Sequence, residues 1–212
     1  MPTIDIKNMH LYNNQVKMNS KTLMSSASGA KIQTKRKPQI SLLIGGCKSG
    51  KSSYSHDYAL GFGYNSNQRV IIATSKSRID EVTKKSESLK TTNDENYTII
   101  EDSTNIEKTI KNLSSEAQIV IIDNISVWLS NLLKNKEDVD KKQKDLLDFL
   151  ANPKQDVIII SNMIGLGIVP DEKCEKALRD LSGNFNQQLA KLSDNVILLI
   201  AGLPLKVKGD LL

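Results

Sequence analysis

Residues 45–52 have the sequence Gly-Gly-Cys-Lys-Ser-Gly-Lys-Ser, which matches the pattern G-x-x-x-x-G-K-[ST] at every fixed position. The apolar run 40–44 precedes this segment, and a stretch with helical character follows it. In this pattern backbone N–H groups turn inward around a phosphate, Lys51 reaches the β- and γ-phosphates, and the Ser52 hydroxyl ligates Mg²⁺. The alternative is a glycine-rich turn that meets no phosphate, but the order strand, loop, helix disfavours it. The segment therefore predicts a nucleotide-binding domain.

The length and composition of the chain suit one α/β domain. Its 212 residues are enough for one well-packed domain and too few for two of ordinary size. Hydrophobic residues make up 39% of the chain and aromatic residues only 4%, as in a sheet built from Ile, Val and Leu. We expect residues 39–212 to form this domain, preceded by a basic extension over residues 1–38.

The net charge of +5 is concentrated in that extension. Residues 1–38 contain seven of the 29 basic residues but only one of the 24 acidic residues, so 22 basic and 23 acidic residues remain for the domain. A nearly neutral domain lacks the broad basic surface that a nucleic-acid backbone requires, and we expect no nucleic-acid partner. The extension is rich in Asn, Ser, Thr and Lys and is expected to be disordered. A targeting peptide is the alternative, although such peptides favour Arg and the extension has only Arg36.

The cysteines and the apolar runs bear on the cellular location. Cys47 lies in the glycine-rich segment and Cys174 in an expected helix, which indicates neither a disulfide framework nor a metal site. The longest apolar runs, residues 157–160 and 196–201, have the length of strands and not of membrane spans. We expect a soluble, cytoplasmic protein without a membrane span.

Short apolar runs alternate with amphipathic segments from residue 40 onward. Several runs are apolar at every position, which is typical of strands buried on both faces of a mainly parallel sheet. The expected strands are residues 40–44, 70–73, 98–100, 119–122, 157–160 and 196–201. The expected helices are residues 106–113, 125–133 and 174–192, the last opened by Pro170-Asp171-Glu172 with its early acids. The pattern predicts an α/β fold with helices on both faces of the sheet.

Two segments at strand ends are further candidates for the site. Residues 118–123 form an apolar run that ends in the carboxylate of Asp123, as expected of the acid that holds Mg²⁺ or its water. Strands also end in Asp for turn chemistry alone, but the loop at 45–52 favours the functional interpretation. Residues 161–170 form a glycine-containing turn after another strand, where ligands of open α/β sheets gather. An ordinary β-to-α turn is equally compatible with that composition.

Several motifs, taken in order, resemble a known enzyme family. Besides the phosphate-binding loop they are Ile72-Ala-Thr-Ser75 followed by Asp80-Glu81, Asn131-Leu-Leu133, Gly165-Leu-Gly-Ile-Val-Pro170, Arg179-Asp180 with Gly183, Asn186-Gln187 and Ala190, and Ala201-Gly202 with Lys206-Val-Lys208. This set resembles the bifunctional adenosylcobinamide kinase and adenosylcobinamide-phosphate guanylyltransferase of cobalamin biosynthesis. The G-x-G-I-V-P and R-D-x-x-G-x-x-N-Q elements are more specific than the phosphate-binding loop alone.

The resemblance implies a RecA-like P-loop nucleoside triphosphate hydrolase fold, in a cytosolic enzyme that is often a homotrimer. Such an enzyme phosphorylates the aminopropanol hydroxyl of its corrinoid substrate, adenosylcobinamide, from ATP or GTP with Mg²⁺. It then transfers GMP from GTP through a guanylylated histidine and releases pyrophosphate. A neutral imidazole suits this second step because it attacks an α-phosphate without first losing a proton.

The resemblance also implies roles for individual residues. Lys51 and Asp123 would be catalytic, and Ser52 and Asp123 would hold Mg²⁺. Glu101 takes the position of the family's acid after the third strand, by spacing. The full set that would contact the nucleotide is Gly45, Gly46, Cys47, Lys48, Ser49, Gly50, Lys51, Ser52, Ala73, Thr74, Ser75, Glu101 and Asp123.

The chain departs from the family where guanylyl transfer is concerned. Counted from Asp80-Glu81 without a gap, the guanylylated histidine falls at Ser88, and the same count places Glu101 correctly. Ser88 is therefore predicted to mark an inactive nucleophile position. Of the two histidines, His10 lies in the extension and His56 in the helix after the loop, and we expect neither to be a substitute.

Two further replacements affect the same half of the reaction. Met163 stands where the family has the acid of its S/T-N-E-V-G element, and residues 92–96 replace an arginine-bearing segment. Three functions remain open on these grounds. The first is a kinase of this family with guanylyl transfer weakened or lost. The second is a catalytically degenerate relative that only binds nucleotide, and the third is a P-loop kinase for another small molecule.

Overall fold

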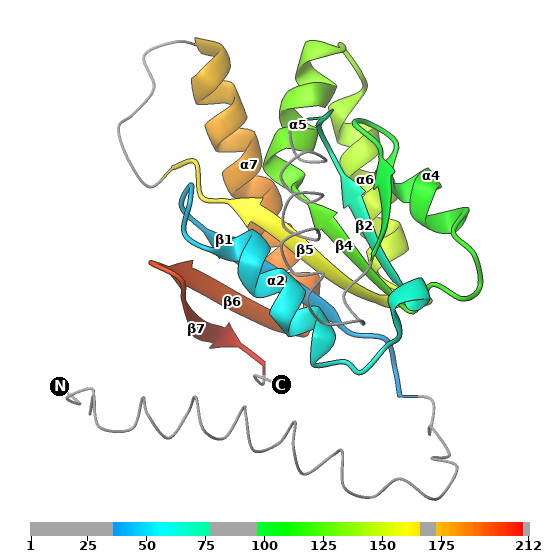
Figure 1. Ribbon diagram of the computed structural model, residues 1–212. Coiled ribbons are helices and arrows are strands. Elements are labelled where there is room, and N and C mark those ends of the chain that lie inside the picture. Colours follow the sequence, from blue (N-terminus) through cyan, green and yellow to red (C-terminus); the bar gives the residue numbers. More distant parts are fainter. Residues whose placement is uncertain (1–35, 77–96, 166–172, 210–212) are drawn as a thin grey trace, which may run out of the picture. The chain divides into compact units, whose positions relative to one another are not determined.

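The computed structural model describes residues 36–76, 97–165 and 173–209 (Figure 1). The expected disordered extension, the Ser88 position and the helix opening at Pro170-Asp171-Glu172 lie outside the described residues. Of the extension, only Arg36, Lys37 and Pro38 are described, and everything below concerns the compact unit that begins at Pro38.

Seven described strands form one sheet in the order β3-β2-β4-β5-β1-β6-β7. The strands are β1 (Ile40–Gly45), β2 (Arg69–Ala73), β3 (Thr98–Glu101), β4 (Ile119–Asp123), β5 (Asp156–Asn162), β6 (Asn195–Ile200) and β7 (Leu203–Lys208). The first six pair in parallel, and β7 alone runs antiparallel, beside β6. Every residue of β2 and β4 is buried, as the apolar runs 70–73 and 119–122 predict. The expected mainly parallel sheet is confirmed.

The order of the strands determines where the candidate site residues meet. β5 lies between β1, which leads into the phosphate-binding loop, and β4, which ends at Asp123. This is the RecA-like arrangement, and the expected fold class is confirmed. Because parallel strands end at the same edge of a sheet, the loop, the end of β5 and Asp123 lie next to one another.

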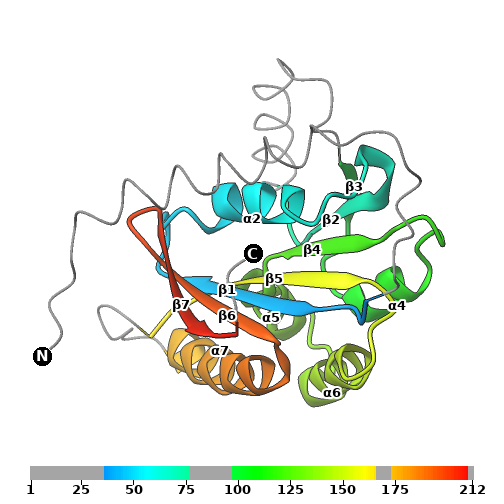
Figure 2. The ribbon, with the colours of Figure 1, turned by 90° about the horizontal axis from the view of Figure 1, so that it is seen from below.

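Helices cover both faces of the sheet, as predicted (Figure 2). Among the described helices, α2 (Lys51–Leu60) lies on one face. The helices α4 (Ile106–Lys111), α5 (Ile125–Lys134), α6 (Val139–Leu150) and α7 (Lys173–Leu192) lie on the other. A short 3₁₀ turn, Ser66–Gln68, leads from α2 towards β2.

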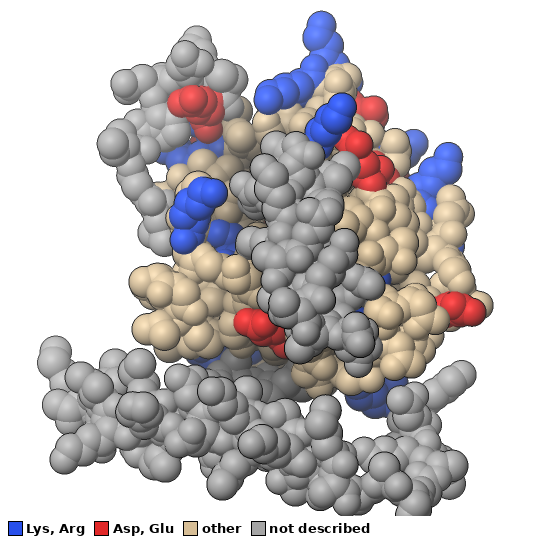
Figure 3. Space-filling model, in the orientation of Figure 1, with Lys and Arg blue, Asp and Glu red and all other residues tan. Residues whose placement is uncertain are grey.

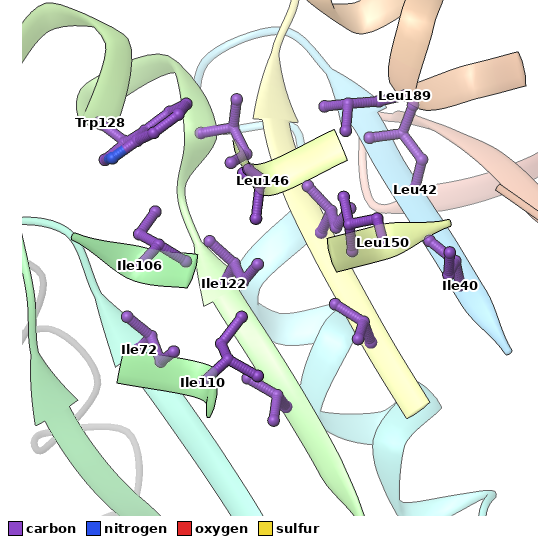
Figure 4. Close-up of a cluster of buried hydrophobic side chains, with 14 of the residues drawn as sticks. Ile40, Leu42, Ile72, Ile106, Ile110, Ile122, Trp128, Leu146, Leu150 and Leu189 are labelled. Carbon is purple, nitrogen blue, oxygen red and sulfur yellow. The ribbon is translucent and has the colours of Figure 1, made fainter. Parts of the chain in front are cut away.

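Alternate side chains of the strands point to the two faces and form two apolar clusters. Leu42 and Ile72 pack with α4, α5, α6 and α7, whereas Leu43 and Ile71 pack with α2. Figure 4 shows the first cluster, in which Trp128 of α5 is 1% exposed. Its indole N–H donates a hydrogen bond to the Thr104 carbonyl oxygen at 3.1 Å, so this large side chain is buried without an unpaired donor. Each fully buried Ile or Leu contributes roughly 1.5–3 kcal/mol to stability.

Besides the short 3₁₀ turn, one described helix and one described strand, α6 and β7, are absent from the sequence-based expectations. α6 has six charged residues among its twelve, and its apolar residues gather in the second half, which weakens the helical period. Asp138 nevertheless caps it, because its side chain accepts a hydrogen bond from the Lys141 N–H. β7 contains Pro204 and is exposed along most of its length, so it lacks the apolar run by which the buried strands were recognised.

Candidate nucleotide-binding site

The phosphate-binding loop has the strand, loop and helix geometry that its sequence predicts. β1 ends at Gly45, and α2 begins at Lys51 after Gly50, whose φ of 95° lies in the left-handed region. At Gly45 an added Cβ would lie 2.5 Å from the carbonyl oxygen of Leu199, so only glycine fits against β6. The first turn of α2 thereby presents its N-terminus at the edge of the sheet, where helices bind phosphates.

Lys51 lies over this loop. The residue is 5% exposed, and its Nζ donates hydrogen bonds to the carbonyl oxygens of Gly45 at 3.1 Å and Gly46 at 2.6 Å. The Oγ of Ser49 lies 3.4 Å from the same Nζ. An ammonium group held here by the loop's own oxygens is placed to neutralise phosphate oxygens that enter the loop.

The turn between β6 and β7 supports the loop from the other side. Gly202 donates its backbone N–H to the carbonyl oxygen of Ser49 at 2.9 Å. The turn is made by Ala201 and Gly202, with φ values of 51° and 84°. An added Cβ at Gly50 would lie 3.0 Å from the Gly202 Cα, so the loop and the turn are in close backbone contact. Sequence reasoning recorded Ala201-Gly202 only as a family motif and did not predict this contact.

Asp123 ends β4 and is 2% exposed. Its backbone is held by the end of β2, because the Thr74 N–H donates to the Asp123 carbonyl oxygen at 3.0 Å. The Thr74 hydroxyl accepts from the Asn124 N–H at 2.9 Å and donates to the Asn124 carbonyl oxygen at 3.0 Å. These bonds fix the position from which the Asp123 side chain starts.

The residues expected to hold Mg²⁺ fit that ion chemically. Ser52, in the first turn of α2, offers a hydroxyl oxygen and Asp123 a carboxylate, and Mg²⁺ prefers oxygen ligands. Within the described ranges, no group of three or more His, Cys, Asp and Glu residues gathers as a metal site of its own. A magnesium ion here would therefore take its other ligands from phosphate oxygens and water, as it does in P-loop sites.

Other expected site residues lie farther from the loop. Glu101 is exposed at the end of β3, and three strands lie between β3 and β1, so about 19 Å separates it from Gly45. Ala73 ends β2, one strand beyond Asp123, and Thr74 follows it; both are fully buried. Ser75, the next residue, is partly exposed. The structure thus gathers the loop and Asp123 at one place but leaves Glu101 at the rim of the sheet.

His56 lies on α2 and is 6% exposed. Its ring meets the edge of the Tyr97 ring, with 5.0 Å between centroids, and the Tyr97 hydroxyl donates to the His56 carbonyl oxygen at 3.3 Å. The side chain is therefore part of an aromatic contact between α2 and the start of β3. The expectation that it does not replace the family's nucleophile stays a prediction.

A pocket of about 340 Å³ lies between the end of β5 and α7, and we call it the α7 pocket. It is lined by Ile44, Met163, Ile164, Gly165, Arg179, Gly183, Asn186, Gln187 and Ala190. The R-D-x-x-G-x-x-N-Q element of α7 and the turn after β5 therefore line one cavity, next to the phosphate-binding loop. Sequence reasoning placed the turn at the pocket, but it did not bring the α7 motif to the same place.

A buried hydroxyl cluster lies behind this pocket. The Ser161 Oγ donates to the Asn186 Oδ1 at 2.6 Å and lies 3.2 Å from the Ser126 Oγ. Ser126 in turn accepts from the Asn162 N–H at 2.9 Å and lies 3.5 Å from the Ser182 Oγ. The cluster joins α5, β5 and α7 at the level of the strand ends, which fixes the wall of the pocket relative to the loop.

The sequence agrees with one family along most of the domain. Residues 41–207 match the family described as cobinamide kinase / cobinamide phosphate guanyltransferase. The chain belongs to this family. It is 26% identical over 171 residues to the bifunctional adenosylcobalamin biosynthesis protein CobP of Pseudomonas aeruginosa, covering 80% of this chain and 97% of that protein. It is 26% identical over 182 residues to CobU of Escherichia coli, covering 79% and 98%. The family expected from the motifs is confirmed, at an identity that marks a divergent member.

A solved structure with which the chain aligns shares less sequence with it than the two relatives above. The flagellar accessory protein FlaH of Methanocaldococcus jannaschii aligns with a TM-score of 0.48 and 13% identity, over 81% of this chain and 79% of FlaH. A likeness of this size carries no argument about function. The order of the strands in the sheet defines the fold class.

The surface and the helices add two observations. On the face shown in Figure 3, the blue Lys and Arg side chains of the described residues lie among red Asp and Glu side chains and form no single patch. None of the helices in the described part of the chain is long and apolar enough to cross a membrane.

Proposed function

We propose that this family member is an adenosylcobinamide kinase that uses ATP or GTP with Mg²⁺, and that its guanylyl-transfer step is weakened or lost. One observation supports the kinase step above all others. A complete phosphate-binding loop holds Lys51 over its carbonyl oxygens, and Asp123 ends the strand two places away in the sheet. The enzyme of this proposal is cytoplasmic and homo-oligomeric. Its substrate is a corrinoid, and it has no nucleic-acid partner.

The kinase step needs mainly positioning and charge neutralisation. The oxygen of the aminopropanol hydroxyl attacks the γ-phosphorus, and the bond from that phosphorus to the β–γ bridging oxygen breaks. The nucleoside diphosphate leaves with the electron pair, and the hydroxyl proton passes to solvent. Lys51 offsets negative charge on the phosphate oxygens, and Mg²⁺ held by Ser52 and Asp123 would supply the second positive charge.

The kinase proposal is tested with Lys51→Ala. We expect phosphorylation of cobinamide to fall by about 10²-fold or more, because one preorganised group that stabilises the transferred phosphate is removed. Lys144→Ala, an exposed lysine of α6, is the control and should keep full activity. Product formation by Lys51→Ala at the wild-type rate would refute the proposal.

The loss of guanylyl transfer is tested with [α-³²P]GTP and Mg²⁺, followed by a denaturing gel and acid treatment. We expect no acid-labile label on the chain, because a serine stands at position 88 where the family has its histidine. Label would show that a nucleophile persists, and the same experiment on His56→Gln would decide whether that residue carries it.

The two other functions predict different results in the same assays. A relative that only binds nucleotide would be stabilised against heat by nucleotide but would release no product. A kinase for another small molecule would show a working phosphate-binding loop without any affinity for cobinamide. Steady phosphorylation of cobinamide excludes both.

A further inference from the structure

The position of the α7 pocket relates it to the transferred phosphate. Ile44, which lines the pocket, directly precedes the first glycine of the loop. Met163, at the end of β5, donates its backbone N–H to the Gly45 carbonyl oxygen at 3.0 Å. Since β5 runs between the strand of the loop and the strand of Asp123, its end lies between the two groups that would hold the γ-phosphate and its metal. A group bound in this pocket would therefore lie near the transferred phosphate, where the molecule that receives the phosphate must also lie.

The lining of the pocket is apolar with little net charge. Ile44, Met163, Ile164 and Ala190 supply apolar surface, and Asn186 and Gln187 are uncharged amides. Arg179 is the one charged residue among the lining residues described. Its Nε and one terminal nitrogen lie 2.8 Å and 2.7 Å from the same carboxylate oxygen of Asp180, which offsets its charge. An ionised ligand group would find no unopposed charge here, whereas a neutral polar group on an aliphatic stem would fit.

Asn186 is the polar group that such a ligand would meet. It is 8% exposed, and its Oδ1 accepts the hydrogen bond of the buried Ser161 hydroxyl. This bond directs the carbonyl end of the side chain into the hydroxyl cluster. The Nδ2 is left as the donor, and within the described residues it has no acceptor of its own. A buried donor of this kind favours a ligand that brings a carbonyl oxygen.

We propose that the α7 pocket binds an uncharged carboxamide arm of the phosphate acceptor, with Asn186 Nδ2 donating to the carbonyl oxygen of that arm. This inference rests on the proposed function, because cobinamide carries amide arms around its ring. The aliphatic stem of the arm packs on Ile44, Ile164 and Ala190. The pocket thereby orients the acceptor so that its hydroxyl meets the γ-phosphate.

Gly183 allows the pocket to be filled without disturbing the fold. It lies within α7, and an added Cβ would meet no atom within 4 Å. In Gly183→Leu the new side chain occupies the cavity, and a glycine is removed from a helix interior, which favours the helix. Asn184→Leu is the matched control, because the next residue of α7 is exposed and does not line the pocket.

The readouts are two dissociation constants for each full-length variant. One is for dicyanocobinamide in the presence of a non-hydrolysable nucleotide and Mg²⁺, and the other is for a fluorescent nucleotide alone. We expect Gly183→Leu to weaken cobinamide binding by about tenfold or more, while nucleotide binding changes by less than about twofold. Asn184→Leu should leave both constants unchanged.

Asn186→Asp tests the hydrogen bond separately. This change keeps an oxygen acceptor for Ser161 but replaces the donor by a second oxygen, and we expect cobinamide to bind about tenfold more weakly. Ser182→Ala is its control, because Ser182 belongs to the same hydroxyl cluster but does not line the pocket. Equal weakening by Ser182→Ala would show that the effect comes from the cluster and not from the pocket.

The outcomes separate the pocket from the proposed function. Wild-type cobinamide affinity in both Gly183→Leu and Asn186→Asp overturns the pocket assignment, even if the kinase is active. Cobinamide binding without phosphorylation refutes the kinase proposal, while the variants still decide the role of the pocket. A wild-type chain that does not bind cobinamide refutes both.

Discussion

The fold buries two oppositely charged residues, Lys51 and Asp123, at the edge of the sheet where β1 and β4 end. Both are at most 5% exposed, although buried charges are costly unless opposite charge or hydrogen bonds offset them. The Lys51 ammonium has carbonyl oxygens of the loop as acceptors. Phosphate oxygens and a magnesium ion would supply the charges that such a pair of residues is arranged to meet.

Asp123→Asn should separate the contribution of the metal ion to phosphoryl transfer from the contribution of the phosphate-binding loop. We expect phosphoryl transfer with Mg²⁺ to fall by about 10²-fold or more, because the amide is a poorer partner for the ion or its water. Nucleotide affinity measured in EDTA should not change, since the loop is intact. The measurement is a titration with fluorescent nucleotide with and without Mg²⁺, beside a kinase assay. Asp148→Asn on α6 is the control, and an equal loss there would contradict the assignment.

Single residues of the site differed in how far sequence could place them. The loop was predictable because its residues are contiguous and its glycines are required by local geometry, as at Gly45. Asp123 was predictable because a strand end is visible as a break in an apolar run. The distance of Glu101 from the loop was not, because it depends on the order of the strands. That Met163 and Asn186 line the same pocket depends likewise on how α7 packs against β5.

At the scale of elements, the turn between β6 and β7 is an unexpected support of the site. Gly202→Ala places a Cβ at a φ of 84° and should cost about 1–2 kcal/mol of unfolding free energy. Because the Gly202 N–H holds the Ser49 carbonyl, we also expect nucleotide to bind about three- to tenfold more weakly. Denaturant unfolding and nucleotide titration measure the two effects.

Gly63→Ala is the matched control for that turn. Gly63 has a φ of 74° and lies just beyond the C-terminal end of α2, where an added Cβ meets no atom within 4 Å. The Gly63→Ala variant should lose about as much unfolding free energy as Gly202→Ala but should keep the wild-type affinity for nucleotide. If both variants lost the same affinity, the turn would have no specific role at the loop.

The elements themselves were predicted where sequence and burial agree. All six parallel strands and the helices α4, α5 and α7 were expected, because their apolar periods reflect the sides on which they are buried. α6 was missed because its first half is almost wholly polar after Val139. β7 was missed because an edge strand with exposed Leu203, Leu205 and Val207 shows no contrast between a buried and a solvent face.

For the whole molecule, the residues before β1 should be dispensable for the domain. Pro38–Leu212 forms one compact unit by itself, and the family match begins at residue 41. We expect deletion of residues 1–35 to shift Tm by less than about 2 °C, equivalent to less than about 1 kcal/mol, and to leave nucleotide binding unchanged. Calorimetry and a nucleotide titration would measure this. A markedly lower Tm would show that the extension is part of the folded unit.

The position of β1 in the sheet has a consequence for the growing chain. β1 is the first of the described strands to be translated, yet its two neighbours, β5 and β6, follow β2, β3 and β4, and Ser41 pairs with Asn195, 154 residues further on. When the ribosome has just synthesised the phosphate-binding loop, neither of the two strands that pair with β1 has been made. Pairings this distant in sequence form slowly and leave apolar strands uncovered meanwhile. Because the Gly202 N–H holds the Ser49 carbonyl, the loop gains this support only after the β6–β7 turn has been synthesised.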